Sequence, residues 1–321
     1  MDHYSRSALN FFAANPLDRL VDKRRNLAWL STQLAAANTR FVPVWRMQNL
    51  FTDANSTIAR LLTATELPQA LAPDTVTLLG AHEETVYFAL DVEQDAVDAP
   101  PAWVTAYGAF RDLRMVGVAI DPFLGAQLAY ARAMIYWERR HRFCGDCGHP
   151  TRSTEGGFVR TCTNTACGKQ IFPRTDPAII VLVQAGEHCL LARQASWPPG
   201  RYSIIAGFVE PGESLEDAVK REVHEEAGIE VAEITYQSSQ PWPFPSSLML
   251  GFMAQAATTQ FNLIDNELED ARWFTRAQIA EEVRAGTLKL PPGLSISRRL
   301  IESWFDAGDQ GKLREVAPEA W

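Results

Sequence analysis

Three glutamates, Glu222, Glu225 and Glu226, crowd into the stretch REVHEEAG just ahead of Gly228. Carboxylates this close on one helix repel one another unless something cationic lies among them. Hard divalent cations take oxygen ligands, and Mg²⁺ in particular is usually held by few carboxylates together with substrate phosphates. The residue types therefore favour a divalent-cation site that acts on a phosphorylated compound.

A helix of about four turns must carry these carboxylates. Gly212 and Ser214 mark its start, with Asp217 as the partner in a capping box, and Gly228 is a natural stop. At about 100° per residue the three glutamates continue an apolar stripe, so we expect all three to face inward. That stripe consists of Leu215, Ala218 and Val219.

A solvated acidic face is the competing interpretation, because Glu is a good helix former and Lys220 and Arg221 lie close by. The position of the glutamates near the C-terminal end counts against it, since the helix dipole disfavours negative charge there. We therefore expect Glu222, Glu225 and Glu226 to form a functional acidic ridge.

Residues 207–229, GFVEPGESLEDAVKREVHEEAGI, resemble the Nudix box, Gly-x5-Glu-x7-Arg-Glu-apolar-x-Glu-Glu-x-Gly-apolar, at every fixed position. The resemblance implies a loop–helix–loop on an αβα sandwich that hydrolyses a nucleoside diphosphate linked to another moiety. It also implies a site for Mg²⁺ or Mn²⁺ and a role for each matching residue. These are Glu222 and Glu226 as metal ligands, Glu225 as a further ligand or base, Arg221 as the residue that orients the carboxylates, and the carbonyl of Ala206 as a backbone ligand.

The chemistry of pyrophosphate explains this demand for carboxylates. A pyrophosphate repels an attacking hydroxide, so metal ions must neutralise the phosphoryl oxygens, orient a water and lower its pKa. Glutamates at i, i+3 and i+4 can hold such ions from one helix. The spacing leaves open which glutamate takes the proton from water.

Residues 239–249, SQPWPFPSSLM, interleave three prolines with Trp242 and Phe244. Such a stiff segment offers planar rings on which a base or a nicotinamide can stack. A proline-rich edge strand with two core aromatics is the alternative interpretation.

Beside the Nudix box, SQPWPFP resembles the array that marks the NADH pyrophosphatase family of Nudix hydrolases. The resemblance extends to an upstream zinc ribbon, to IFPRTDPAII and to PPGLSISRRLI, over roughly residues 110–302. It implies cleavage of NADH or NAD⁺ to nicotinamide mononucleotide and AMP. It further implies a homodimer in which the Trp242 segment lies near the partner's site.

The same resemblance implies substrate contacts at matching positions. Phe208 would stack on the nicotinamide-side ring, and Phe172 stands where the family usually has Tyr, which removes a hydroxyl. Glu267 matches a further metal-linked carboxylate, with Glu269 and Asp270 as rivals for that role. The other matched positions are Gln240, Pro241, Trp242, Pro243, Phe244, Pro245, Ser246, Ser247, Ser297 and, more weakly, Arg114 and Glu155, for which a structural ion pair is an equal alternative.

Four cysteines supply thiolates for a tetrahedral zinc site: Cys144-x2-Cys147 and Cys162-x4-Cys167. Four protein ligands close the coordination sphere, so we expect the zinc to be structural. The x4 spacing departs from the usual x2 knuckle. His141 and His149 flank the site as alternative ligands, with surface histidine as the competing interpretation, and Cys189 is expected to be a small buried hydrophobe.

The composition limits what the 321 residues can do. An apolar content of 46% predicts a globular protein of two or three units, and a formal charge of −9 argues against binding nucleic acid through phosphate neutralisation. No stretch approaches the roughly 18 to 20 apolar residues of a membrane span, and the N-terminus shows no apolar leader. We therefore expect a cytoplasmic protein with no membrane partner, and the paired cysteines fit a reducing compartment.

The predicted fold class is α+β, with a Nudix αβα sandwich preceded by a mixed α/β domain and a small zinc ribbon. The helix that starts at Asp121-Pro122 separates its apolar and charged positions onto faces, which predicts a core-facing connector. The predicted parts are an N-terminal domain over 1–120, a connecting helix over 121–143, the ribbon over 144–172, the Nudix domain over 173–310 and a tail over 311–321.

Three rival functions remain at this stage. Removal of an NAD cap from an RNA 5′ end uses the same chemistry, and Lys and Arg gathered at the mouth of the site would favour it. Hydrolysis of ADP-ribose or dinucleoside polyphosphates is a further option. A nucleic-acid-binding zinc-ribbon protein with a vestigial Nudix domain belongs to a different class, and the intact glutamates speak against it.

Overall fold

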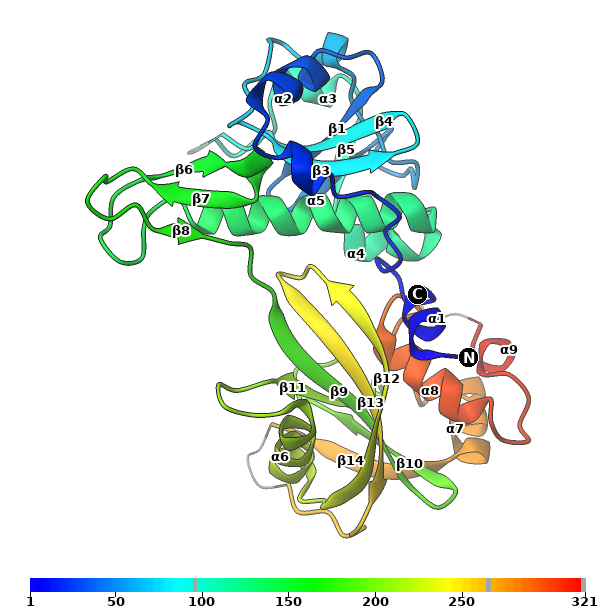
Figure 1. Ribbon diagram of the computed structural model, residues 1–321. Coiled ribbons are helices and arrows are strands. Elements are labelled where there is room, and N and C mark those ends of the chain that lie inside the picture. Colours follow the sequence, from blue (N-terminus) through cyan, green and yellow to red (C-terminus); the bar gives the residue numbers. More distant parts are fainter. Residues whose placement is uncertain (95–96, 264–266, 319–321) are drawn as a thin grey trace. The chain divides into compact units, whose positions relative to one another are not determined.

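The computed structural model describes residues 1–94, 97–263 and 267–318, and the chain groups into two compact units (Figure 1). We call them the N-terminal unit and the C-terminal unit. The N-terminal unit comprises Ala14–Thr175 and Trp242–Ser246, and the C-terminal unit comprises Met1–Ala13, Asp176–Pro241 and Ser247–Trp321. Among the described residues, no helix is both long and apolar enough to cross a bilayer.

A five-stranded sheet in the order β3-β4-β1-β2-β5 forms the centre of the N-terminal unit. Strands β1 and β4 run parallel, and the other neighbours run antiparallel. The strands are β1 (Thr39–Trp45), β2 (Gln48–Phe51), β3 (Thr77–His82), β4 (Thr85–Asp91) and β5 (Ala109–Arg111). The short helices are α2 (Leu27–Leu34), α3 (Ala102–Thr105) and α4 (Leu113–Val116), with 3-10 turns η1 (Val21–Lys23), η2 (Ala64–Glu66), η3 (Gly117–Ala119) and η4 (Glu155–Gly157).

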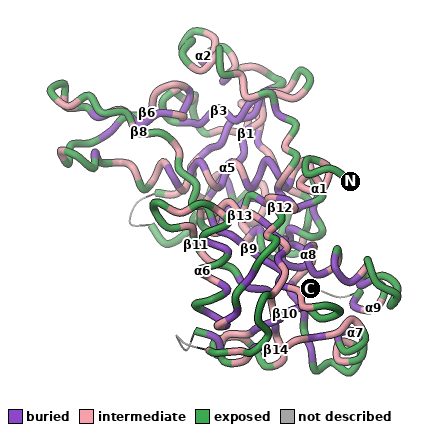
Figure 2. The backbone as a smooth tube through the Cα atoms, turned by 60° about the horizontal axis from the view of Figure 1, so that its bottom comes forward, coloured by how far each residue is buried: buried purple, intermediate pink, exposed green. Residues whose placement is uncertain are grey.

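Helix α5 (Pro122–Arg140) packs against this sheet and is buried along much of its length (Figure 2). It begins as predicted, because the Asp121 side chain accepts from the Leu124 N–H and Pro122 occupies the first turn. The predicted connector is therefore the helical layer of the N-terminal unit. One expectation was wrong: Arg132 lies on the buried face, only 7% exposed, so the charged positions do not all separate from the apolar ones.

A three-stranded antiparallel sheet forms the predicted ribbon: β6 (Thr151–Thr154), β7 (Val159–Cys162) and β8 (Gln170–Ile171). Arg160 of β7 fastens it to α5, donating to Glu138 (2.9 Å) and to the Thr151 carbonyl (2.8 Å). Burial raises the pKa of Glu138, and Arg160 opposes that rise. The ribbon is thus part of the N-terminal unit.

The C-terminal unit contains a six-stranded sheet in the order β12-β13-β9-β10-β14, with β11 paired to β9. Strand β9 (Asp176–Ala185) runs parallel to β13 and antiparallel to β10 and β11. The other strands are β10 (His188–Arg193), β11 (Ile205–Phe208), β12 (Val231–Trp242), β13 (Ser247–Ala256) and β14 (Asp270–Thr275). The helices are α1 (His3–Ala8), α6 (Leu215–Ala227), α7 (Arg276–Arg284), α8 (Ile296–Phe305) and α9 (Leu313–Val316).

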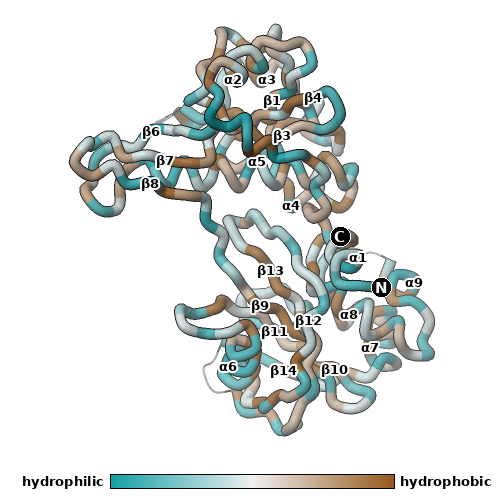
Figure 3. Tube along the Cα trace, viewed as in Figure 1, coloured by the Kyte–Doolittle hydropathy of each residue, from teal (hydrophilic) through white to brown (hydrophobic). Residues whose placement is uncertain are grey.

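Alternating side chains of β9 build a core on each face of this sheet. Ile179 and Val181 pack in the cluster that contains Val219 of α6, whereas Ile180 packs in the cluster that contains Leu300 of α8. The period of two sends neighbouring residues to opposite faces. Helices therefore cover both faces of the sheet, which gives the predicted αβα sandwich. Helix α6 is largely hydrophilic, as its teal colour shows (Figure 3).

The two ends of the chain complete the C-terminal unit. Asn10 donates to Ser238 Oγ (3.2 Å) and to the Ser239 carbonyl (2.8 Å), so the first residues lie along β12 rather than in the predicted domain 1–120. Leu313 of α9 is fully buried in the core cluster beside α8. The described part of the predicted tail is therefore packed, and residues 319–321 lie outside the described part.

Candidate active site

Helix α6 has the termini that the sequence predicts. Ser214 Oγ accepts from the Asp217 N–H, and the Asp217 carboxylate accepts from the Ser214 N–H, both at 3.1 Å. Gly228 ends the helix at φ 69°, a left-handed conformation that glycine adopts without a steric penalty. The acidic ridge therefore stands on a helix with both ends fixed.

Two of the three glutamates face inward. Glu226 is only 5% exposed, and the Glu222 side chain is 13% exposed, whereas the Glu225 side chain is 52% exposed. The expectation of three inward carboxylates was therefore wrong for Glu225. Position 225 lies about 100° around the helix from the buried Glu226, at the edge of the buried stripe, where a long side chain can reach solvent.

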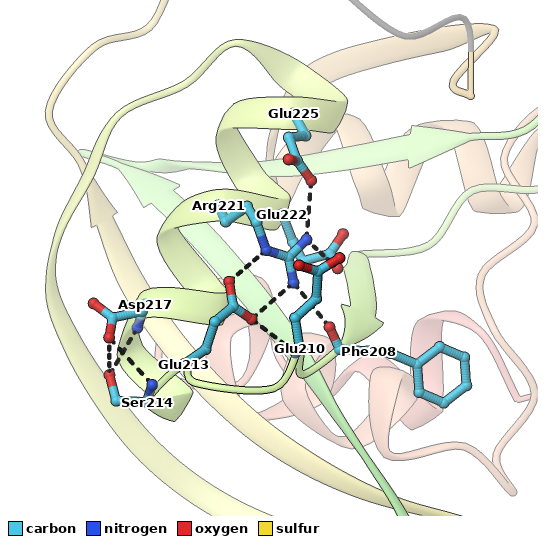
Figure 4. Close-up of polar contacts among 8 residues, drawn as sticks. All are labelled: Phe208, Glu210, Glu213, Ser214, Asp217, Arg221, Glu222 and Glu225. Carbon is cyan, nitrogen blue, oxygen red and sulfur yellow. Dashed lines mark hydrogen bonds and ion pairs between the residues drawn. The ribbon is translucent and has the colours of Figure 1, made fainter.

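Arg221 donates five hydrogen bonds, four to carboxylate oxygens and one to a backbone carbonyl (Figure 4). Its Nε and NH2 donate to Glu213 (2.5 and 3.0 Å), and its NH1 donates to Glu222 and to Glu225, each at 2.9 Å. NH2 also donates to the Phe208 carbonyl at 2.8 Å. The Glu213 pair raises the pKa of Arg221, and Arg221 lowers the pKa of Glu213. The guanidinium thus ties the loop after β11 to the acidic helix.

Gly207 in β11 lets the backbone approach the Glu222 carboxylate closely. A Cβ at this position would stand 1.9 Å from Glu222 Cδ and 2.0 to 2.2 Å from its two oxygens, so a larger residue would displace the carboxylate from its present position. Ala206, the predicted backbone ligand, is the preceding residue of the same strand. A backbone carbonyl and two inward carboxylates are hard oxygen donors of the kind that Mg²⁺ and Mn²⁺ bind.

Burial raises the pKa of Glu222, Arg221 opposes the rise, and the charges of Glu225 and Glu267 add to it. Glu267 is therefore within electrostatic reach of the acidic ridge, although it lies far along the chain. Its two rivals have other partners, since Glu269 pairs with Arg193 and Asp270 accepts a hydrogen bond from Tyr202. These contacts favour Glu267 for the additional carboxylate.

The predicted substrate residues fall into two groups. Phe208 and Phe172 expose 60% and 47% of their surface, as stacking surfaces must, but they belong to different units. Gln240 and Ser297 are buried, at 1% and 2% exposure. The polar atoms of both side chains hydrogen-bond within the protein, and contact of either residue with the substrate stays a prediction.

The side-chain amide of Gln240 forms hydrogen bonds with three backbone groups. Nε2 donates to the carbonyls of Phe11 (3.1 Å) and Leu294 (2.8 Å), and Oε1 accepts from the Ile296 N–H (2.8 Å). Ser297 Oγ hydrogen-bonds with Ser203 Oγ at 2.8 Å. Gln240 therefore joins β12 to the start of α8, and Ser297 joins α8 to the segment before β11.

For Arg114 and Glu155 the structure contains the ion pairs of the alternative interpretation. Arg114 NH2 lies 2.6 Å from Asp112, and Glu155 lies 2.8 Å from Arg25. Arg114 also stands over the ring of Phe244, 5.4 Å from its centroid. Each of these two side chains is therefore in an ion pair, and Arg114 also contacts the ring of Phe244.

The structure brings the four predicted cysteines together, with all four Sγ atoms within 4.8 Å of one another. Two Sγ–Sγ distances are 3.8 Å (Cys144–Cys167) and 3.4 Å (Cys147–Cys162). Zn–S bonds of about 2.3 Å in a tetrahedron place sulfurs about 3.8 Å apart, so the cluster fits zinc despite the x4 spacing. His141 instead bonds to the Trp137 carbonyl (2.7 Å), and Cys189 is fully buried as predicted.

Comparison with known proteins agrees with this geometry. Three family models match: the NUDIX domain (residues 173–292), the NADH pyrophosphatase-like rudimentary NUDIX domain (38–137) and the NADH pyrophosphatase zinc ribbon domain (139–172). The human NAD-capped RNA hydrolase NUDT12 is 34% identical over 92% of this chain and 73% of its own length. NAD-capped RNA hydrolase NudC of Stutzerimonas stutzeri is 42% identical over 74% of this chain and 78% of its own. A solved NUDIX hydrolase from Nitrosomonas europaea covers 43% of this chain and 79% of its own, at 25% identity and a TM-score of 0.37.

The fold and the acidic site together define a Nudix hydrolase. The chain belongs, more narrowly, to the NADH pyrophosphatase family of Nudix hydrolases, which carries the rudimentary NUDIX domain and the zinc ribbon.

Proposed function

We propose that this enzyme hydrolyses the pyrophosphate of NADH and NAD⁺ to nicotinamide mononucleotide and AMP, and by the same chemistry removes NAD caps from RNA. The observation that carries the proposal is the acidic ridge of α6, whose Glu222 and Glu226 face inward beside Gly207. The NAD-capped RNA hydrolases among the relatives support capped RNA as a substrate, and the matched NADH pyrophosphatase domains support NADH.

In the reaction a water oxygen forms a bond to one phosphorus and the bond from that phosphorus to the bridging oxygen breaks. Mg²⁺ or Mn²⁺, when bound, neutralises phosphoryl charge and lowers the pKa of the water. Glu222, Glu226 and the Ala206 carbonyl would hold the cations, with Glu267 as a further carboxylate. Arg221 keeps two of the glutamates oriented, and a glutamate of the ridge takes the proton from water.

Three aromatic side chains are proposed to recognise the substrate. Phe208 and the rings of Trp242 and Phe244 offer apolar faces for stacking on a nicotinamide or a base. Trp242 and Phe244 meet edge to face, with centroids 5.0 Å apart and planes at 74°. Phe172 contributes a stacking surface without the hydroxyl that a tyrosine would add.

A comparison of three substrates tests this proposal. NADH, ADP-ribose and NAD-capped RNA are incubated with the full chain, with and without Mg²⁺ or Mn²⁺, and the products are identified by mass. We expect metal-dependent release of reduced nicotinamide mononucleotide from NADH and of nicotinamide mononucleotide from capped RNA. Hydrolysis of ADP-ribose as fast as NADH would contradict the substrate assignment, and no metal-dependent hydrolysis of any of them would support the vestigial-domain alternative.

We also propose a homodimer, as family membership implies, and a cytoplasmic location, which the paired cysteines favour. Light scattering of the purified protein measures the first, and fractionation of the producing cells measures the second. A monomer that is fully active would contradict a site shared between two copies.

A further inference from the structure

The aromatic segment Trp242–Ser246 is held by the N-terminal unit, although strands β12 and β13 on either side of it belong to the C-terminal unit. Pro243 and Pro245 have no N–H to donate, so the segment can form few backbone hydrogen bonds. One local bond joins the Phe244 N–H to the Trp242 carbonyl at 2.8 Å. Side chains must therefore fix much of its conformation.

Arg132 of α5 makes two directed contacts with this segment. Its Nε donates to the Pro243 carbonyl at 2.5 Å. Its guanidinium carbon lies 4.7 Å from the centroid of the Phe244 ring, within the range of a cation–π contact. Arg132 thus holds the backbone on one side of Phe244 and the ring itself.

This arginine is costly to keep inside the protein. It is 7% exposed and stands among the buried apolar positions of α5, such as Leu128 and Ile135. Burial lowers the pKa of Arg132 to about 10, while Asp112 opposes that effect and Arg114 adds to it. A buried charge disfavours the folded state unless hydrogen bonds and partner charges compensate. Its contacts with the aromatic segment are part of that compensation.

We propose that Arg132 is a positioning residue for the pyrophosphatase reaction, which fixes the Trp242–Ser246 turn so that the aromatic rings meet the nicotinamide side of the substrate. The inference rests on the proposed function for its substrate. Arg132 acts through Pro243 and Phe244 and does not itself touch the dinucleotide.

The two contacts require the guanidinium. Its planar face stacks on an aromatic ring while an N–H at its edge donates to a carbonyl, whereas a lysine ammonium is a compact charge that cannot do both in this way. Arg132→Lys should therefore retain only part of this positioning, and Arg132→Gln should retain little.

Arg139 offers a matched control on the same helix. It is similarly inaccessible, with a side chain 17% exposed, and its NH1 pairs with Asp91 at 2.6 Å. Arg139→Gln therefore removes a largely covered, ion-paired cation from the same helix without touching the aromatic segment. A general loss of stability should appear in both variants, and a loss of positioning in one.

Steady-state kinetics with NADH and ADP-ribose separate these outcomes. We expect Arg132→Gln to raise KM for NADH about ten- to a hundredfold, the range of a lost charge-assisted hydrogen bond, with kcat little changed. KM for ADP-ribose, which has no nicotinamide to stack, should rise far less. Arg132→Lys should fall between wild type and Arg132→Gln, and Arg139→Gln should match wild type.

Hydrogen exchange provides a readout that does not depend on the substrate. Peptides covering residues 240–248 should exchange faster in Arg132→Gln and Arg132→Lys than in wild type or Arg139→Gln. Unchanged exchange there, or equal rises in KM for both substrates that follow the melting temperature, would overturn the positioning role. Failure of wild type to cleave NADH, with the exchange pattern as expected, would instead refute the proposed function.

Discussion

Glu222 and Glu226 owe their chemistry to the helical positions they occupy. Both replace apolar side chains on the buried stripe of α6, whereas Glu225 leaves on the exposed side and pairs with Arg221. The types and spacing of these residues were readable from the sequence. The exposure of Glu225 was harder to predict. A helical wheel places the three neighbouring glutamates on one face and does not show which of them lies at its edge.

The raised pKa of Glu222 predicts a pH-dependent affinity for the cation. A proton and a cation compete for the same carboxylate, and burial favours the protonated form. As pH falls from neutral through the raised pKa, the apparent Kd for Mn²⁺ should therefore increase, measured by electron paramagnetic resonance titration. In Glu222→Gln the remaining dependence on pH should be shallower, and an equally steep dependence would count against Glu222 as a ligand.

At the scale of elements, the sequence predicts α6, α5 and the ribbon because each carries local signals. Caps, a proline in the first turn and paired cysteines specify these elements within a few residues. The pairing of Asn10 with Ser238 and Ser239 could not be predicted, because it joins residues more than 200 positions apart. Arg132 left a signal that was missed, a charge on the apolar stripe of α5.

The first residues should stabilise the C-terminal unit by covering the edge strand β12. Asn10 is 4% exposed and donates two hydrogen bonds to β12, so Asn10→Ala should lower the free energy of unfolding by about 1–3 kcal/mol. Ser5→Ala is the control, since Ser5 is partly exposed and its hydroxyl donates to the exposed Asp2. Urea denaturation measures both, and equal effects would contradict a role for the arm.

At the scale of the whole molecule, each unit carries its own source of stability. The C-terminal unit has two apolar cores around one sheet. The ribbon has few buried apolar residues and depends on its four thiolates and on Arg160. Composition gave only a range of two or three units and no boundaries, because Met1–Ala13 and Trp242–Ser246 each join the unit that is remote in sequence.

Removal of zinc should destabilise the N-terminal unit, because metal binding to the four thiolates contributes folding free energy. We expect a chelator, and separately Cys167→Ser, to lower the melting temperature and the zinc content. Cys189→Ala should retain its zinc, since Cys189 lies outside the cluster. Metal analysis verifies each state, and a melting curve unchanged after verified zinc loss would refute a structural metal.

The most direct test of the account is the position of manganese in crystals grown with Mn²⁺, located by anomalous scattering. We expect a peak between the carboxylates of Glu222 and Glu226, and its loss together with turnover in a normally folded Glu226→Gln variant. Manganese bound only elsewhere, with full hydrolysis of NADH retained in Glu226→Gln, would contradict it.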